Sequence, residues 1–251
     1  MTTFFDSIKM GRAAYNRNSV PPTGYAEDEI YGVPLTQTLV YQVGTASTSL
    51  ASGVFYASSA IAGTLTGTGA LVSGGVATFD VPRCVSVTAS SNMSTTTFTF
   101  QGTDAYGAPL TASVLGPTGN TFGNTGSFVT TLSAFKTVTT ASANGAATGL
   151  LAIGNSDTYG LPFRLINVGE ALGAYINGGS ATVPPTYTAG LAATGVATAT
   201  TADVRGTVAL ATAVLANGSR YISFRFITPN DGTAAGNDTK ENSYGVTPYS
   251  G

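Results

Sequence analysis

The chain has no histidine, no tryptophan and a single cysteine, Cys84, among its 251 residues. Without histidine it cannot build a Ser-His-Asp or Cys-His nucleophile system, and it lacks the usual zinc ligand. One cysteine cannot form an intramolecular disulfide or a thiolate metal cluster. Cys84 lies in an apolar segment, where we expect a buried and unreactive thiol. These absences disfavour an enzyme, and they indicate no cofactor.

Charge is scarce as well. Only 9% of the residues are charged, the net charge is −2, and the 10 lysines and arginines are scattered without forming a patch. A nucleic-acid partner is therefore not expected. No apolar run reaches the length of about 18 residues that a transmembrane helix needs, so no membrane partner is expected. Residues 1–15 also lack the apolar core of a signal peptide, which predicts synthesis and solubility in a host cytoplasm.

What the chain does contain is β-forming sequence with 32 glycines. Residues 85–88, 97–101 and 110–114 alternate apolar and polar side chains with a period of two, which is typical of strands with one buried face. Asp104 and Gly107 lie where a turn would join the second and third segments. This pattern predicts an antiparallel meander within an all-β chain. We expect an antiparallel β-sandwich, with either a jelly-roll or an immunoglobulin-like topology.

Three Asn-Gly pairs predict tight turns between strands. They are Asn144-Gly145, Asn177-Gly178 and Asn217-Gly218. Each is flanked by strand-like residues, and Asn-Gly suits the two-residue hairpin turn because both positions adopt positive φ angles readily. The sequence therefore predicts a hairpin at each of the three.

The two ends of the chain differ from its middle. Prolines and an acidic triplet predict an extended N-terminal arm over 1–33, with a short helix at 3–14, followed by a β-sandwich body over 34–229 and a polar C-terminal tail over 230–251. Aromatic and apolar side chains recur along both ends. Either they pack on the body of the same chain, or they lie on a neighbouring subunit. The interface candidates are Phe4, Phe5, Ile8, Tyr15, Tyr25 and Tyr31 in the arm, and Tyr244 and Tyr249 in the tail.

The remaining candidates for chemistry are carboxylates. Asp104, Asp157 and Asp203 lie near expected strand ends, but their spacing matches no catalytic pattern, and aspartates there usually form turns. Asp203 and Arg205 share one face of an expected strand, which predicts a local ion pair at the surface. The Asn-Asp pairs after residue 229 lack the pattern of a calcium loop. We therefore expect neither catalytic nor metal-binding residues.

Two stretches resemble a known family. Residues 82–111 contain PRCVSV followed by TFTFQGTDAYGAPLT, and residues 203–207 read DVRGT ahead of the expected strands around Asn217-Gly218. The sequence of these stretches resembles that of structural proteins of tailed bacteriophages, in particular capsid decoration, or cement, proteins. The resemblance implies a β-sandwich whose extended termini clamp neighbouring capsid subunits. It implies a place on the capsid surface of a virion, with the major capsid protein and other copies of the chain (a homo-oligomer) as partners.

A second hypothesis is a receptor- or glycan-binding module of a tail fibre or a surface adhesin. Sugar-binding faces use exposed aromatic rings, and Tyr106 and Phe122 are the candidates for this role. Fibres usually show repeats or heptads, and the sequence has neither. A hydrolase with a paired carboxylate site is a third hypothesis, which requires two acidic side chains close enough to flank a bond.

Overall fold

A computed structural model describes residues 36–44, 56–65, 67, 69, 71–119, 128–162, 165, 168–180, 185–190, 205–210 and 218–227. The N-terminal arm with its expected helix, and the C-terminal tail, lie outside the described residues. The division into arm, body and tail therefore stays a prediction.

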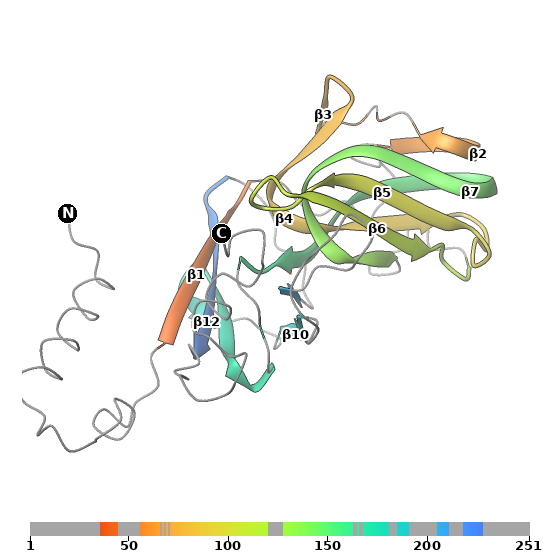
Figure 1. Cartoon of the computed structure of the whole chain (residues 1–251). Coiled ribbons are helices and arrows are strands. Elements are labelled where there is room, and N and C mark those ends of the chain that lie inside the picture. Colours follow the sequence, from red (N-terminus) through yellow and green to blue (C-terminus); the bar gives the residue numbers. More distant parts are fainter. Residues whose placement is uncertain are drawn as a thin grey trace, which may run out of the picture.

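The described residues are almost entirely β-structure, which confirms the all-β, antiparallel fold class (Figure 1). Two sheets form a sandwich-like body, and the larger of them is curled. None of the described helices is long and apolar enough to cross a membrane. The elements are β1 (Thr36–Val43), β2 (Tyr56–Leu65), β3 (Val72–Ser73), β4 (Val76–Ala89), β5 (Thr97–Thr103), β6 (Pro109–Leu115), β7 (Val129–Gly160), a 3-10 turn (Val168–Glu170), β8 (Ala171–Ile176), β9 (Gly179–Ser180), β10 (Thr186–Ala189), β11 (Gly206–Ala209) and β12 (Arg220–Ile227).

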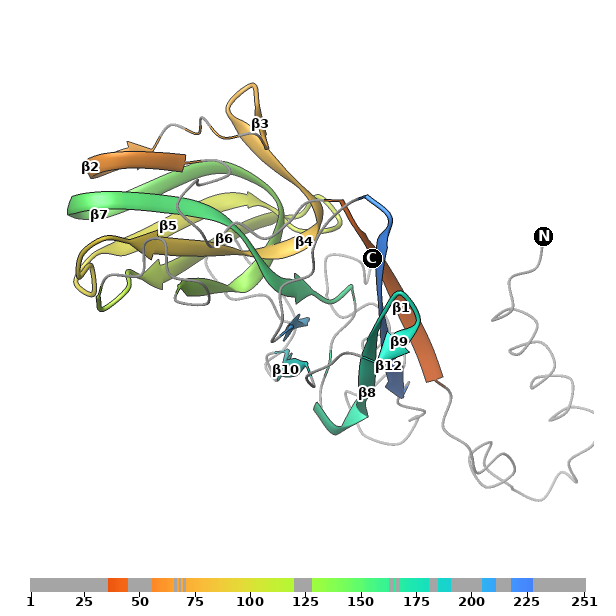
Figure 2. The same cartoon turned by 180° about the vertical axis from the view of Figure 1, so that it is seen from behind.

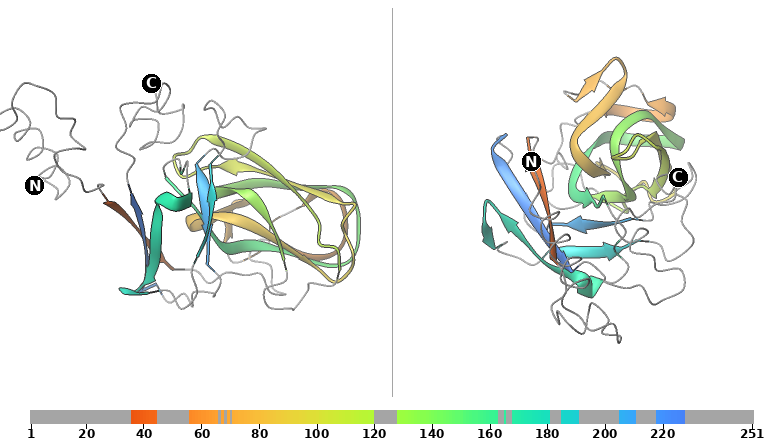
Figure 3. Two further views of the ribbon diagram at one scale, coloured as in Figure 1. Left: turned by 90° about the horizontal axis from the view of Figure 1, so that it is seen from below. Right: turned by 60° about the vertical axis from the view of Figure 1, so that its left-hand side comes forward.

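The larger sheet is built around β7, a strand of 32 residues. β7 pairs with β4 twice: Val87 of β4 lies opposite Val129 on one side and Ile153 on the other. Between those two contacts, β7 also pairs with β2 and with β5. A strand that returns to the same neighbour must bend round it, so the sheet curls into the half-barrel seen end-on in Figure 3.

For residues 79–116 the sequence predicted a meander of three strands. The pairing of the second strand with the third is correct, and the pairing of the first strand with the second is wrong. β5 and β6 form an antiparallel hairpin, and Gly107 at its turn has a φ of 85°. β4, however, pairs with β7 and not with β5. The alternation expected along 85–88 is also wrong, because these side chains are buried on both faces of β4. The polar ones are satisfied there by main-chain carbonyls: the hydroxyls of Ser86 and Thr88 donate to Gly154 and Ala152.

The three Asn-Gly predictions had different outcomes. Asn177-Gly178 is the turn between β8 and β9, with φ angles of 50° and 83°, as predicted. Asn144-Gly145 is not a hairpin, because it lies inside the continuous strand β7. The strands that flank Asn217-Gly218 do not pair with each other: β11 pairs with β7 and β10, whereas β12 pairs with β1 and β8. Asn217 itself lies outside the described residues.

The smaller sheet has the order β1-β12-β8-β9 and lies at one end of the curled sheet (Figure 2). β1 and β12 pair over their whole length, from Thr36 opposite Ile227 to Val43 opposite Arg220. Consequently the first residue of β1 and the last residue of β12 are neighbours at one end of this sheet. The predicted arm and the predicted tail join the body there.

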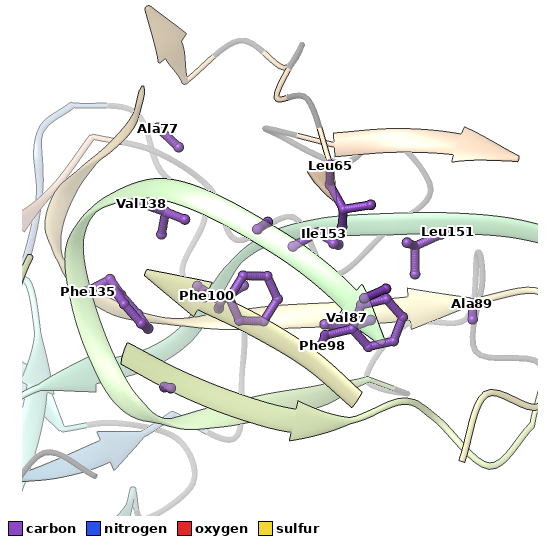
Figure 4. Packing of buried hydrophobic residues seen from close by; sticks show 14 of the residues in the cluster. Leu65, Ala77, Val87, Ala89, Phe98, Phe100, Phe135, Val138, Leu151 and Ile153 are labelled. Carbon is purple, nitrogen blue, oxygen red and sulfur yellow. The ribbon is translucent and has the colours of Figure 1, made fainter. Parts of the chain in front are cut away.

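Two hydrophobic clusters correspond to the two sheets. The larger cluster fills the curl of β7 and includes Phe98, Phe100 and Phe135 (Figure 4). The smaller cluster lies against the inner face of the smaller sheet and includes Tyr41, Phe224 and Phe226. Cys84 is fully buried, as expected. β4 and β7 contribute to both clusters, so these two strands join the halves of the body.

Close approach of β5 to β7 requires a glycine at position 102. A Cβ atom on Gly102 would overlap the carbonyl oxygen of Thr137. We expect Gly102→Ala to lower the free energy of unfolding by about 1–3 kcal/mol, because an extra methyl forces the paired strands apart. Gly44→Ala is the control, since a Cβ there meets nothing within 4 Å, and its effect should stay within about 0.5 kcal/mol. Urea unfolding measures both, and equal stability of the two variants would contradict the close approach.

Candidate functional site

The interface candidates of the arm and the tail all lie outside the described residues, and their roles stay predictions. They are Phe4, Phe5, Ile8, Tyr15, Tyr25, Tyr31, Tyr244 and Tyr249. Phe122 and Asp203 lie outside them as well. The structure does place Asp104, Asp157 and Arg205, and it brings charged side chains together in two buried clusters.

The first cluster, which we call the Arg83 cluster, consists of Asp80, Arg83, Asp157 and Tyr159. It lies where β4 and β7 pass from the larger core to the smaller one. Arg83 is fully buried and meets Asp80 in a two-pronged contact, with its Nε and Nη2 each 2.8 Å from a carboxylate oxygen. Its Nη1 lies 3.3 Å from Asp157 Oδ1, which also accepts a hydrogen bond of 2.9 Å from the Tyr159 hydroxyl. Such paired geometry gives both strength and orientation.

The Arg83 cluster also ties the two sheets together. The Asp80 carboxylate accepts a hydrogen bond from the amide of Gly44, directly after β1, and the Asp80 carbonyl accepts one from Lys136 on β7. The Arg83 guanidinium lies 5.0 Å from the centre of the Tyr159 ring. That ring packs in turn against Tyr41 of β1 and Phe224 of β12. One buried charge is therefore in contact with both halves of the body.

Burial changes the proton affinities in this cluster. By itself, burial lowers the pKa of Arg83, but the hydrogen bond from Arg83 to Asp80 and the nearby negative charges outweigh it, so the pKa of Arg83 is raised. Burial raises the pKa of Tyr159 far above its ordinary value. Arg83 consequently stays charged and Tyr159 stays neutral at physiological pH. The cluster thus holds a charged arginine inside the fold.

The second cluster joins Asp104 at the β5–β6 turn to Arg205, which directly precedes β11. Asp104 Oδ2 lies 2.6 Å from Arg205 Nη2, and both side chains are almost completely buried. Asp104 Oδ1 accepts hydrogen bonds from the amides of Tyr106 and Ala108, at 2.8 and 2.9 Å. This is the Asx-type turn that the sequence predicted. The surface position expected for Arg205 is wrong, because that side chain is 1% exposed and pairs with a residue 101 positions away. Asp203 lies outside the described residues, so its expected pairing with Arg205 stays a prediction.

Tyr106 completes this second cluster. Its ring centre lies 5.3 Å from the Arg205 guanidinium, and its hydroxyl donates to the carbonyl of Pro162 at 2.6 Å. Tyr106 as a whole residue is still 41% exposed. These contacts of Tyr106 lie within the chain, which favours a role in holding the turn over a role in binding a sugar.

The clusters also bear on the hydrolase hypothesis. A paired carboxylate site needs one acid and one base or nucleophile that can reach a substrate. Asp104 and Asp157 are each bound by a buried arginine instead. In the part of the chain that the structure describes, no group of three or more acidic, cysteine or histidine side chains is placed to hold a metal ion. The arrangement is suited to stability.

No protein-family model, no curated protein and no solved structure matches the chain. Inferences about function therefore start from the fold, the two buried clusters and the chemistry of the exposed surface.

Removing the charge of Asp104 should be severely destabilising. In Asp104→Asn the Oδ1 acceptor of the turn is kept, but Arg205 remains as a buried charge without its carboxylate, which costs about 3–5 kcal/mol of unfolding free energy. The double variant Asp104→Asn with Arg205→Met should lose less unfolding free energy than the single variants Asp104→Asn and Arg205→Met lose in sum, and we expect the difference to be about 1–3 kcal/mol. Urea unfolding of the four proteins gives this coupling. Arg225→Met, at an exposed arginine, is the control and should change stability by about 0.5 kcal/mol or less.

Stability should fall at alkaline pH. Tyrosine has a pKa of about 10 in the unfolded chain. Because the folded pKa of Tyr159 is higher, only the unfolded state loses this proton above about pH 10, and stability declines as pH rises. Tyr159→Phe should make that decline shallower by about 1.4 kcal/mol per pH unit. Burial raises the pKa of Tyr187 to about 12, so Tyr187→Phe should alter the slope only between about pH 10 and 12. Identical slopes in all three proteins would contradict both assignments.

Proposed function

We propose that this chain is a structural virion protein that binds the outer surface of a phage capsid and staples neighbouring major capsid protein subunits. The observation that carries the proposal is the position of the two chain ends. Thr36 lies opposite Ile227, so residues 1–35 and 228–251 join the body at adjacent points at one end of the smaller sheet. Both aromatic-bearing segments therefore start from one place on a β-body that is stabilised by buried ion pairs.

A stapling protein needs a body that keeps its shape and segments that reach beyond it. The Arg83 cluster and the Asp104–Arg205 pair supply internal fixation at two separate points of the fold. The arm and the tail supply Phe4, Tyr15 and Tyr244, which belong to the residue types that dominate binding energy in interfaces. When many copies bind one shell, modest contacts at each copy add up through avidity.

The chemistry of the chain supports the same proposal. A chain with 9% charged residues and no histidine has little means of catalysis, while its resemblance to decoration proteins concerns structural components of virions. The alternative receptor- or glycan-binding role would use Tyr106, whose hydroxyl and ring face are both in contact with residues of the same chain. We therefore favour the capsid-binding role.

Deleting residues 1–33 tests the role of the arm. We expect the deletion to weaken binding to empty shells of the phage's major capsid protein by about tenfold or more, because hot-spot aromatics are lost. Co-sedimentation of the purified protein with shells measures the affinity. Within the full chain, replacing Phe4, Phe5 and Ile8 by alanine should have a large part of this effect. Replacing Thr2, Thr3 and Ser7 by alanine is the matched control and should have little.

Two results would count against the proposal. If the full chain shows no affinity for shells, the capsid-binding function is wrong. If the protein without residues 1–33 binds as tightly as the full chain, the function survives but the arm is not its anchor.

A further inference from the structure

β1 is an edge strand with none of the features that usually protect an edge. Among the described strands it pairs only with β12, over eight consecutive residue pairs without a bulge. Its sequence, TQTLVYQV, contains no charge and no proline. In Figures 1 and 2, no other strand that is drawn runs along its outer side. An edge of this kind presents main-chain donors and acceptors that readily pair with another strand.

The other edge strands of the described part are each protected. β3 and β9 contain two residues and β10 contains four, which leaves little backbone to pair. β2 has two irregularities in its register, near Ser59 and Gly63. β6 begins with Pro109 and packs beside β7. Natural proteins use short strands, bulges and prolines in this way to prevent association through edges. The long unprotected edge of β1 therefore stands apart from the rest of the fold.

We propose that the outer edge of β1 pairs with β1 of a second copy, antiparallel across a two-fold axis, so that two small sheets join into one. Such an interface is self-complementary because each copy contributes the same surface. With Val40 on the axis, Val40 meets Val40 on the outer face, and Leu39 of one copy lies opposite Tyr41 of the other on the inner face. No charged residue of β1 is brought near its own copy in this register or in the neighbouring ones.

Burial along β1 agrees with an edge that continues into another sheet. Tyr41 and Val43 are buried against the smaller core, whereas Leu39 is only partly covered and Val40 is 52% exposed. Pairing with a second β1 would extend the apolar inner face and would cover Leu39 with Tyr41 of the partner. Main-chain hydrogen bonds supply the affinity in this mode of recognition, and alternate side chains set the register.

Pairing with the chain's own arm is less suitable. The arm enters β1 just after Pro34 and carries Glu27, Asp28 and Glu29 in succession. In a strand, consecutive side chains point to opposite faces, so at least one of these carboxylates would lie on the apolar inner face. A second β1 brings no such charge. This proposal specifies the surface used between copies of the chain, and it does not depend on capsid binding.

The test compares two double substitutions in the full chain by sedimentation over a range of protein concentrations. The wild type should form a dimer. Thr38→Glu with Val40→Glu should raise the dissociation constant by about tenfold or more, because like charges then face each other across the axis. The glutamate at position 38 lies opposite Arg225 of β12, so we expect it not to lower the stability of the folded monomer.

The matched control is Tyr221→Glu with Ser223→Glu. These residues belong to the central strand β12, lie opposite Gln42 and Val40, and share the outer face of the sheet. The control should remain a dimer, because the β1 edge is unchanged. Thermal unfolding of dilute samples checks that both variants fold.

Three results would overturn the proposal: a wild-type monomer at every concentration, a dimer that tolerates the glutamates in β1, or a control as disrupted as the β1 variant, which would indicate association through the sheet face. No shell is present in this experiment, so its outcome is separate from that of the capsid-binding test.

Discussion

The fold depends on a buried arginine. Taking the charge of Arg83 out of water is costly, and the cost is offset only if oxygen acceptors of opposite charge surround it in good geometry. Asp80 and Asp157 provide them, from β4 and from the last part of β7. This requirement brings β4 and the last part of β7 together. Through the amide of Gly44, it also holds the end of β1 next to them. Two hydrophobic clusters are thereby held in one body.

The Asp104–Arg205 pair applies the same principle at another point. It anchors the turn of the β5–β6 hairpin to the segment that enters β11, so a local motif becomes part of the tertiary structure. In a chain with so few charges, the use of two arginines inside the fold leaves little charge for the surface. Among the described residues, those that are exposed are mostly uncharged, and glycine and threonine are the commonest.

Local sequence patterns predict the structure correctly where a few neighbouring residues determine a turn. The turn of the β5–β6 hairpin needs an acceptor at Asp104 and a positive φ at Gly107, and both requirements are visible in the sequence. The same holds for Asn177-Gly178. The equally strong signal at Asn144-Gly145 failed because β7 gains more by remaining extended: it pairs with β2 and β5 along this stretch, and the Asn144 side chain accepts a hydrogen bond from the amide of Thr97. Neither neighbour is identifiable from residues 140–150 alone.

The sequence by itself determined the all-β class, the burial of Cys84, and the lack of the side chains that most catalytic and metal sites need. These conclusions follow from composition and short-range periodicity. The tertiary structure alone decided that β4 lies between two parts of one long strand, that Arg205 pairs with Asp104, and that β1 pairs with only one of the other described strands. Each of these depends on which distant segments meet. Many strand edges in one chain could pair with one another. Which of them do so depends on the total apolar burial and on the pairing of buried charges in the folded chain.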